Sequence, residues 1–321
     1  MWLRAICKGR TWRSAGLASE TDGTARDHSR RFVQSKTMRV CETIEEMRSA
    51  CRAARHGGKR LGFVPTMGAL HEGHLSLVRA ARESCDVVAV SIFVNPTQFG
   101  AGEDLARYPR SFERDCAMLE KEKVDLIFAP SVEEMYPEGA VSWVTVEGLS
   151  DKLDGRSRPG HFRGVTTVVA KLFHIVEPDA AFFGQKDAAQ VAIIRRMARD
   201  LNFAVEVVAC PIVREADGLA MSSRNVYLDG QERKQALGLN RALLRVNAVW
   251  EGGERDAGKL LEAGREEIAR QSGVLLDYFE IVDADSLELV KSAGAGAMAA
   301  VAGWVGATRL IDNLVLGTQR G

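Results

Sequence analysis

The sequence predicts an α/β protein with a doubly wound, Rossmann-like parallel sheet and a smaller C-terminal α+β domain. Short apolar runs alternate with amphipathic helical patterns from Met38 to Cys210, as in successive βαβ units. The run 86–94 is apolar almost throughout, which is typical of a parallel strand covered on both faces. After about Asn225, two helical patterns precede three closely spaced strand patterns, which indicates a separate α+β unit.

The first domain begins with a helix over 43–56, because Thr43 followed by Glu46 forms a capping box. The other expected helices are 74–84, 111–123, 163–176 and 188–201. The expected strands are 60–65, 86–94, 126–129, 180–183 and 204–210. Pro96 bars further central pairing after 86–94, because it lacks the N–H that the ladder needs.

The second domain should contain helices and strands in separate blocks. The expected helices are 229–250 and 256–271, and the expected strands are 276–282, 298–305 and 308–316. The resulting division is an extension over 1–37, a Rossmann-like domain over 38–212 and a lid domain over 213–321.

Composition limits the class of protein. The 321 residues are 46% apolar and 27% charged with a formal net charge of zero, which is ordinary for a globular chain and disfavours nucleic-acid binding. Six cysteines form no Cys-x-x-Cys pair, so they indicate free thiols in a reducing compartment. The apolar stretch 293–307 is too short to span a membrane and is expected to be a turn leading into a core strand.

The first 37 residues differ from the rest, with eight Lys or Arg and three Asp or Glu. A disordered extension, or a start codon placed too far upstream, is the favoured interpretation, and it leaves the protein cytoplasmic. A mitochondrial transit peptide is the alternative, because such peptides are rich in Arg and Ser. Glu20, Asp22 and Asp27 count against that alternative.

The most informative motif is 65–74, which follows the apolar run 61–64 and opens onto a helical pattern. It places His71 and His74 at a strand-to-helix turn, where free N–H groups and the helix dipole favour anions. Gly73 leaves room for close approach of a ligand. A pair of surface histidines without function is the alternative, and a zinc site is disfavoured because no third ligand is indicated.

Three other motifs carry polar groups that suit a phosphate or a small polar molecule. They are 182–187 with Lys186, 217–225 with its hydroxyl residues and Arg224, and 95–99 with Gln98. Each alone has a plain interpretation as a solvated helix start, a capped turn or an ordinary loop. Together with the histidine turn, three of the four follow strands at the carboxyl edge of the sheet, where α/β folds bind ligands.

Five motifs occur in order along the chain: 65–74, 93–99, 104–110, 158–165 and 214–225. On these motifs the chain from Met38 to Leu316 resembles the pantothenate synthetase (pantoate–β-alanine ligase) family. The first motif is similar to the His-x-Gly-His turn of the wider nucleotidylyltransferase group. The run 221–224 resembles the mobile Lys-Met-Ser-Lys-Ser loop of that group.

The resemblance implies an ATP-dependent ligation in two steps. The carboxylate of (R)-pantoate attacks the α-phosphate of ATP, so that pantoyl adenylate forms and pyrophosphate leaves. The amine of β-alanine then attacks the adenylate, giving pantothenate and AMP. ATP use implies Mg²⁺, and the family resemblance implies a homodimer without nucleic-acid or membrane partners.

The resemblance assigns ATP and pantoate binding to the domain over 38–212, and it also implies the site residues. His74 is the catalytic general acid, and Gln98 and Gln190 bind pantoate, with Gln98 also close to β-alanine. The implied ATP-binding residues are Met67, Gly68, Ala69, Leu70, His71, Glu72, Gly73, His74, Gly184, Gln185, Lys186, Asp187, Val213, Met221, Ser222, Ser223 and Arg224. The metal ligands stay open: Asp115 is a candidate, although a solvated helix aspartate is an equal interpretation.

The run 184–190 departs from the family pattern. Gln185 replaces a usual glutamate, and Ala188 and Ala189 replace an aromatic residue and a glutamine. These departures keep a catalytically dead nucleotide-binding regulator as an alternative function. The other alternative is a cytidylyl or phosphopantetheine transferase of the same group. The motifs 95–99 and 158–165 disfavour that transferase. Retention of His71, His74, Lys186 and Arg224 disfavours the regulator.

Overall fold

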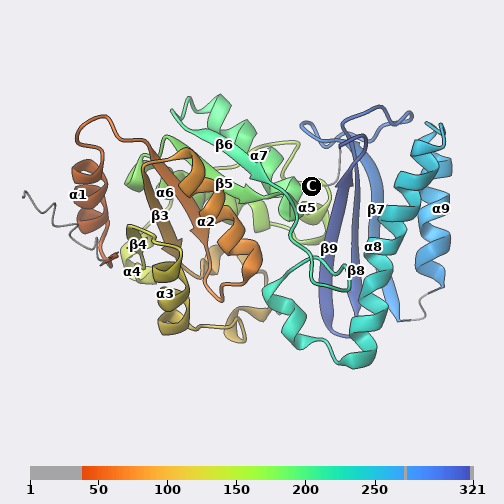
Figure 1. The fold of residues 1–321 in the computed structure, drawn as a ribbon, viewed down its shortest axis with the longest axis horizontal. Coiled ribbons are helices and arrows are strands. Elements are labelled where there is room, and N and C mark those ends of the chain that lie inside the picture. Colours follow the sequence, from red (N-terminus) through yellow and green to blue (C-terminus); the bar gives the residue numbers. More distant parts are fainter. Residues whose placement is uncertain (1–37, 271–272, 319–321) are drawn as a thin grey trace, which may run out of the picture. The chain divides into compact units, whose positions relative to one another are not determined.

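The computed structural model describes residues 38–270 and 273–318, and its larger sheet has six parallel strands (Figure 1). The strands are β1 (Arg39–Cys41), β2 (Leu61–Thr66), β3 (Val87–Ile92), β4 (Leu126–Phe128), β5 (Ala180–Gly184) and β6 (Glu206–Cys210). Their order across the sheet is β1-β4-β3-β2-β5-β6. The predicted doubly wound fold is confirmed, and the short β1 is a strand that the sequence pattern did not indicate.

Helices cover both faces of this sheet, which explains why its central strands are apolar throughout. Alternate side chains of β2 face opposite ways. Phe63 belongs to the core formed with α1 (Ile44–Ala54), α6 (His161–Val176) and α7 (Ala188–Asp200). Val64 belongs to the core formed with α2 (Glu72–Ser84) and α3 (Phe112–Lys121). Each predicted helix of this domain is present, with ends shifted by a few residues.

The chain reverses its winding direction at β2, which pairs with β3 on one side and β5 on the other. The β2–β3 ladder covers six residue pairs, from Leu61 to Thr66 on β2. The β2–β5 ladder covers two pairs, Gly62 with Ala180 and Phe63 with Ala181. Beyond these pairs the two strands part, and this opens a crevice at the carboxyl edge where α/β sheets bind ligands.

Short helical turns line this edge. They are η1 (Pro96–Gln98), η2 (Asp104–Ala106), α4 (Val132–Met135), α5 (Asp154–Ser157), η3 (Gln185–Asp187) and η4 (Ser223–Tyr227). Helix α6 meets η1 backbone to backbone at Gly164, where a Cβ atom would lie 2.3 Å from the Thr97 carbonyl oxygen. Only glycine allows this approach, which holds η1 and its Gln98 against a rigid helix.

The C-terminal elements are α8 (Gly230–Glu251), α9 (Ala257–Ala269) and an antiparallel sheet of β7 (Val274–Asp283), β8 (Ala297–Val305) and β9 (Thr308–Val315) (Figure 1). This sheet is covered on both faces. Ala300 and Ala302 belong to the core shared with the larger sheet, whereas Ala299 and Val301 belong to the core with α8 and α9. Burial on both faces accounts for the small apolar residues of 293–307, which form a turn and then β8, as predicted.

The N-terminal extension and the division into two domains are not tested by these elements. The extension 1–37 lies outside the described residues, as do 271–272 at the expected end of α9. The boundary between 38–212 and 213–321 and the lid role of the second part stay predictions. Within the described ranges, no helix is both long and apolar enough to cross a membrane.

Candidate active site

A cavity of about 230 Å³ lies at the carboxyl ends of β2, β3 and β5. Every motif that the sequence singled out contributes to its wall. Among the predicted site residues, its lining includes Met67, His71, Gly73, His74, Gln98, Gly184, Lys186, Asp187, Gln190, Val213, Met221, Ser222, Ser223 and Arg224. Segments that are more than 100 residues apart in the sequence therefore form one site, at the switch point of the sheet.

The two histidines cap the helix that follows them. His71 is the N-cap of α2, and its Nδ1 atom accepts the Gly73 N–H at 3.1 Å. The Nδ1 atom of His74 accepts the His71 N–H at 3.3 Å. A nitrogen that accepts a hydrogen bond carries no proton, so each neutral ring has its proton on Nε2. A Cβ atom at Gly73 would lie 2.9 Å from the His71 ring, so a larger residue there would displace that ring.

Burial keeps both rings neutral. Desolvation lowers the pKa of His71 to about 4, and the positive charge of Lys186 contributes in the same direction. Desolvation lowers the pKa of His74 to about 3, with further contributions from His71 and Lys186. Each histidine therefore offers an uncharged Nε2–H donor at neutral pH. A bound anion would favour the protonated rings and oppose both shifts.

Gln98 is held by a buried amide network. Its Oε1 atom accepts from Asn95 Nδ2 at 3.0 Å, and its Nε2 atom donates to the Met67 sulfur at 3.2 Å. Asn95 is in turn fixed by Tyr136, whose hydroxyl donates to Asn95 Oδ1 at 2.8 Å, and by the Gly164 carbonyl at 3.2 Å. These contacts set the amide orientation of Gln98. The motif 93–99 could have indicated Asn95, but Tyr136 carried no signal.

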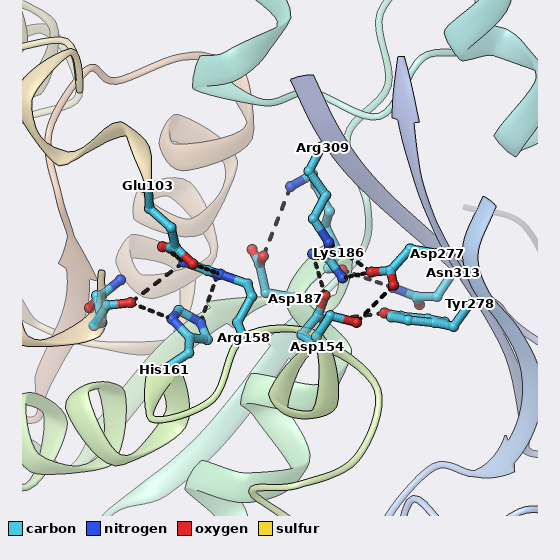
Figure 2. A network of polar contacts seen from close by, with 12 residues as sticks. Glu103, Asp154, Arg158, His161, Lys186, Asp187, Asp277, Tyr278, Arg309 and Asn313 are labelled. Atoms are coloured by element: carbon cyan, nitrogen blue, oxygen red, sulfur yellow. Dashed lines mark hydrogen bonds and ion pairs between the residues drawn. The ribbon is translucent and has the colours of Figure 1, made fainter. Parts of the chain in front are cut away.

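His161 at the start of α6 and Arg158 just before it support Gln98 from a second direction. Figure 2 shows these two side chains together with Glu103. His161 Nδ1 lies 2.8 Å from the Gln98 carbonyl oxygen, and its Nε2 lies 3.0 Å from an Arg158 guanidinium nitrogen. Because Arg158 can only donate, the His161 proton sits on Nδ1. Burial, followed by the charge of Arg158, lowers the pKa of His161 to about 4. Both residues belong to the motif 158–165, but the sequence analysis did not place them in the site.

The cations of the cavity wall differ in how they are neutralised. Arg158 makes a bidentate pair with Glu103 at 2.6 and 2.8 Å. Arg224 makes a bidentate pair with Asp104 at 2.8 and 2.9 Å. Lys186 Nζ lies 3.9 Å from Asp187, at the limit of an ion pair. Lys186 therefore contributes the least compensated of these three charges to the cavity.

Five predicted ATP-binding residues do not line the cavity: Gly68, Ala69, Leu70, Glu72 and Gln185. The Leu70 side chain is in the core with α2, and Glu72 pairs outside with Arg79. Gln185 turns toward the smaller sheet and bonds to Asn313. Gly68 and Ala69 line a different, neighbouring cavity. Any part that these five residues take in nucleotide binding therefore falls to their main chain.

Asp115 of α3 clamps this turn from beneath. It is fully buried, and its carboxylate accepts the Ala69 N–H at 2.8 Å and the Leu70 N–H at 2.9 Å. The clamp holds Gly68 and Ala69 in the left-handed region, with φ of +79° and +50°. Both oxygens are used within the protein, so these contacts give no support to Asp115 as a metal-positioning residue.

The fold and the site together define a nucleotide-binding α/β enzyme: an anion-suited helix start, two imidazole donors and a lysine meet at the switch point of a doubly wound sheet. A family model described as Pantoate-beta-alanine ligase matches residues 39–315. The chain belongs to this family of ligases.

Known proteins support this assignment over nearly their whole length. A pantothenate synthetase of Koribacter versatilis is 62% identical, with 88% of this chain and 99% of that protein covered. The crystal structure of pantothenate synthetase from Thermus thermophilus matches with a TM-score of 0.83 and 50% identity, covering 87% and 99%. The ligase of Francisella tularensis, described as complexed with β-γ ATP and β-alanine, matches with a TM-score of 0.74 and 34% identity, covering 88% and 99%.

The Asp115 clamp leads to a first prediction. Asp115→Asn places an amide N–H₂ where one backbone N–H now finds an acceptor, which leaves that buried donor unpaired at a cost of about 1–3 kcal/mol. The histidine turn should shift, and KM for ATP should rise roughly tenfold while KM for pantoate changes little. Steady-state AMP formation measures both constants.

Ser111→Ala is the matched control, because Ser111 donates the third bond to Asp115 at 3.1 Å and leaves both backbone contacts intact. Its KM for ATP should stay near that of the unaltered protein. An Asp115→Asn enzyme with an unchanged KM for ATP would show that the clamp does not set the turn.

Proposed function

We propose that this cavity joins (R)-pantoate to β-alanine through a pantoyl adenylate, with ATP as the co-substrate. The observation that carries the proposal is the convergence of His71, His74 and Lys186 with the two amides Gln98 and Gln190 on one cavity. A pantoate oxygen bonds to the α-phosphorus as the bond to the pyrophosphate oxygen breaks. The β-alanine nitrogen then bonds to the acyl carbon, loses a proton and displaces AMP.

The nucleotide side of the cavity provides donors and positive charge. We assign ATP contacts to the turn 67–74, the run 184–187, the Val213 main chain and the run 221–224. Phosphates at the start of α2 would meet the positive end of the helix dipole and the Nε2–H donors of both histidines. Lys186 and the hydroxyls near Arg224 would stabilise the charge that passes to the leaving pyrophosphate.

His74 is assigned as the general acid. In the structure its ring is neutral and its proton lies on Nε2, so it begins as a hydrogen-bond donor. A triphosphate beside the ring favours the imidazolium form and raises the pKa of His74 from its low value. Binding of the triphosphate therefore favours uptake of the proton that His74 then donates to it. His71, whose Nδ1 atom accepts the Gly73 N–H and whose ring centroid lies 4.1 Å from that of His74, contacts phosphate beside it.

The pantoate side is neutral and partly apolar. Gln98 and Gln190 can hold the hydroxyl and carboxylate oxygens of pantoate without a formal charge. A tight arginine clamp would make that carboxylate a weaker nucleophile, and Arg158 is already neutralised by Glu103. Val168 and Phe183 line the same cavity and suit the two methyl groups of pantoate.

Mg²⁺ is proposed as the ion that accompanies the triphosphate. Over residues 38–270 and 273–318, no cluster of three or more His, Cys, Asp or Glu side chains could hold a metal. This agrees with magnesium chemistry, because the ion keeps several waters and binds chiefly through substrate phosphates. The Mg²⁺ ion would compensate the part of the triphosphate charge that the single charge of Lys186 leaves uncompensated.

The decisive experiment is an assay of AMP formation with the purified protein. Release of AMP should require ATP, Mg²⁺, pantoate and β-alanine together, and addition of EDTA should abolish it. ATP–pyrophosphate exchange should require pantoate but not β-alanine. Absence of AMP under every Mg²⁺ condition would contradict the ligase, as would turnover only of cytidylyl or phosphopantetheine substrates. ATP binding without any turnover would identify a nucleotide-binding regulator.

The role of His74 has its own test. His74→Gln keeps an acceptor for the His71 N–H, because glutamine is a usual partner at this position of a capping box, but it removes the imidazole. Pantoate-dependent exchange should fall by roughly a hundredfold or more while the thermal midpoint changes little. His56→Gln, at an exposed histidine away from the cavity, should exchange normally. Full activity of His74→Gln would exclude His74 as the acid.

A homodimer is the proposed assembly. Thr167 and Thr166 of α6 hold the Val144 main chain at 3.0 and 2.6 Å, which fixes this segment against the helix. Two residues of the same segment are apolar and exposed, Val141 at 83% and Trp143 at 47%. Exposed apolar side chains on a segment that is held in place suit contact with a second copy of the chain.

Sedimentation equilibrium should therefore give the mass of a dimer. Val141→Glu should shift the population toward monomer, because a charge would be desolvated at the interface. Leu275→Glu, which is 71% exposed on β7, is the matched control and should leave the mass unchanged. A monomeric unaltered protein would refute the dimer, and equal effects of the two variants would refute this interface.

We also propose that the enzyme works in the cytoplasm. The five cysteines within the described residues are free thiols, which a reducing compartment preserves.

A further inference from the structure

We propose that Asn313 of β9 is a positioning residue for Lys186 and thereby links docking of the smaller sheet to adenylate formation. The proposal rests on the function proposed above, because it takes Lys186 to face the phosphates of ATP. Asn313 lies beside Lys186 at the junction between η3 and the smaller sheet (Figure 2). It belongs to no motif that the sequence analysis assigned to the site.

Asn313 makes three hydrogen bonds to two consecutive residues. Its Nδ2 atom donates to the Gln185 carbonyl at 2.9 Å and to the Lys186 carbonyl at 3.0 Å. Its Oδ1 atom accepts from Gln185 Nε2 at 3.2 Å. The side chain is 3% exposed. The amide orientation is unambiguous, because the reverse orientation would place Oδ1 against two carbonyl oxygens.

The segment that carries Lys186 depends on such outside support. η3 is a single turn of three residues between β5 and α7, and no side chain of the described residues caps it. Such short turns leave backbone groups that must find partners elsewhere. The Asn313 amide supplies a partner at the lysine itself. The path of the main chain at Lys186 decides where its ammonium group points, so Asn313 fixes the origin of that side chain.

The neighbouring residue ties a second ATP-side segment to the same strand. Arg214 makes a bidentate pair with buried Asp312 at 2.7 and 2.9 Å. Arg214 also pairs with Ala220 in an isolated antiparallel bridge at the base of the loop that leads to Ser222. Asp312 and Asn313 therefore connect β9 both to η3 and to the loop. The position of β9 therefore determines the positions of two groups of predicted phosphate ligands, one in η3 and one in the loop.

The pairing also explains why glutamine occupies position 185. A glutamate would have no N–H to donate to Asn313 Oδ1, and its charged oxygens would face that oxygen. Reversal of the Asn313 amide would accept the glutamate but would lose both bonds to main-chain carbonyls. Gln185 and Asn313 are therefore a matched pair at the contact between η3 and the second sheet.

The first test uses Asn313→Asp, which keeps the size but places carboxylate oxygens against the two carbonyls. Pantoate-dependent ATP–pyrophosphate exchange should fall at least roughly tenfold, because small displacements of a catalytic group are costly. KM for ATP should rise, and KM for pantoate should not. Aminolysis of added pantoyl adenylate by β-alanine should be unaffected, because pyrophosphate has already left. Gln185→Glu should show the same pattern and serves if Asn313→Asp fails to fold.

Coupling to Lys186 separates positioning from a merely structural role. Lys186→Met should lower exchange strongly, and adding Asn313→Asp to it should cause little further loss. If the two losses simply add, Asn313 does not act through Lys186 and the inference is wrong. If Lys186→Met exchanges normally, the proposed role of Lys186 fails instead, so the two failures are distinguishable.

Arg309→Gln is the matched control for docking. Arg309 also belongs to β9. Its ion pair of 2.7 Å with Asp154 joins the smaller sheet to α5, and its ion pair of 2.7 Å with Asp277 lies within the sheet (Figure 2). Neither ion pair involves the main chain of η3, so the variant should lower the thermal midpoint with a smaller effect on exchange than Asn313→Asp. If Arg309→Gln and Asn313→Asp lower the thermal midpoint equally and also lower the exchange rate equally, the sheet acts as a whole and the inference is wrong.

Discussion

The parting of β2 and β5 is the constraint on which the site depends. Two paired residues join these strands, against six between β2 and β3. Past Phe63 the two strands no longer share a ladder, and their following turns can carry functional groups without filling the gap. One strand leads to the histidine turn, and the other leads to Lys186. A crevice placed by topology needs no long loop to form it, which gives both turns rigid foundations.

The electrostatics of the crevice follow from how each charge is compensated. Arg158 and Arg224 are each paired with a carboxylate, so they bring shape and hydrogen bonds with little net charge. Burial keeps both histidines uncharged. In the absence of nucleotide, the cavity therefore has little repulsion between positive charges. Lys186 supplies most of the remaining field, and a bound triphosphate would draw protons toward the histidines. Such a site becomes more positive when its anionic substrate arrives.

The features that could be predicted from the sequence are those that depend on residues close together in the chain. The capping box at Thr43, the apolar central strands and the turn at His71 all follow from residues within one or two helical turns, and the structure has each of them. The supports of the site are different in kind. Asp115 reaches Ala69 across 46 positions, and Asn313 reaches Lys186 across 127 positions. No periodicity or short motif marks a side chain that bonds to the main chain of a distant turn.

The same reasoning explains why the second sheet does more than cover the site. Its central strand is built of small residues because both faces are buried, and small side chains let the strands lie close to the larger domain. That closeness brings the Asn313 amide to the main chain of a turn that lacks its own cap. Gln185 then completes the pair with an N–H that glutamate does not have. Gln185 is thus part of the geometry that docks the second sheet. The position of the lysine follows from that geometry.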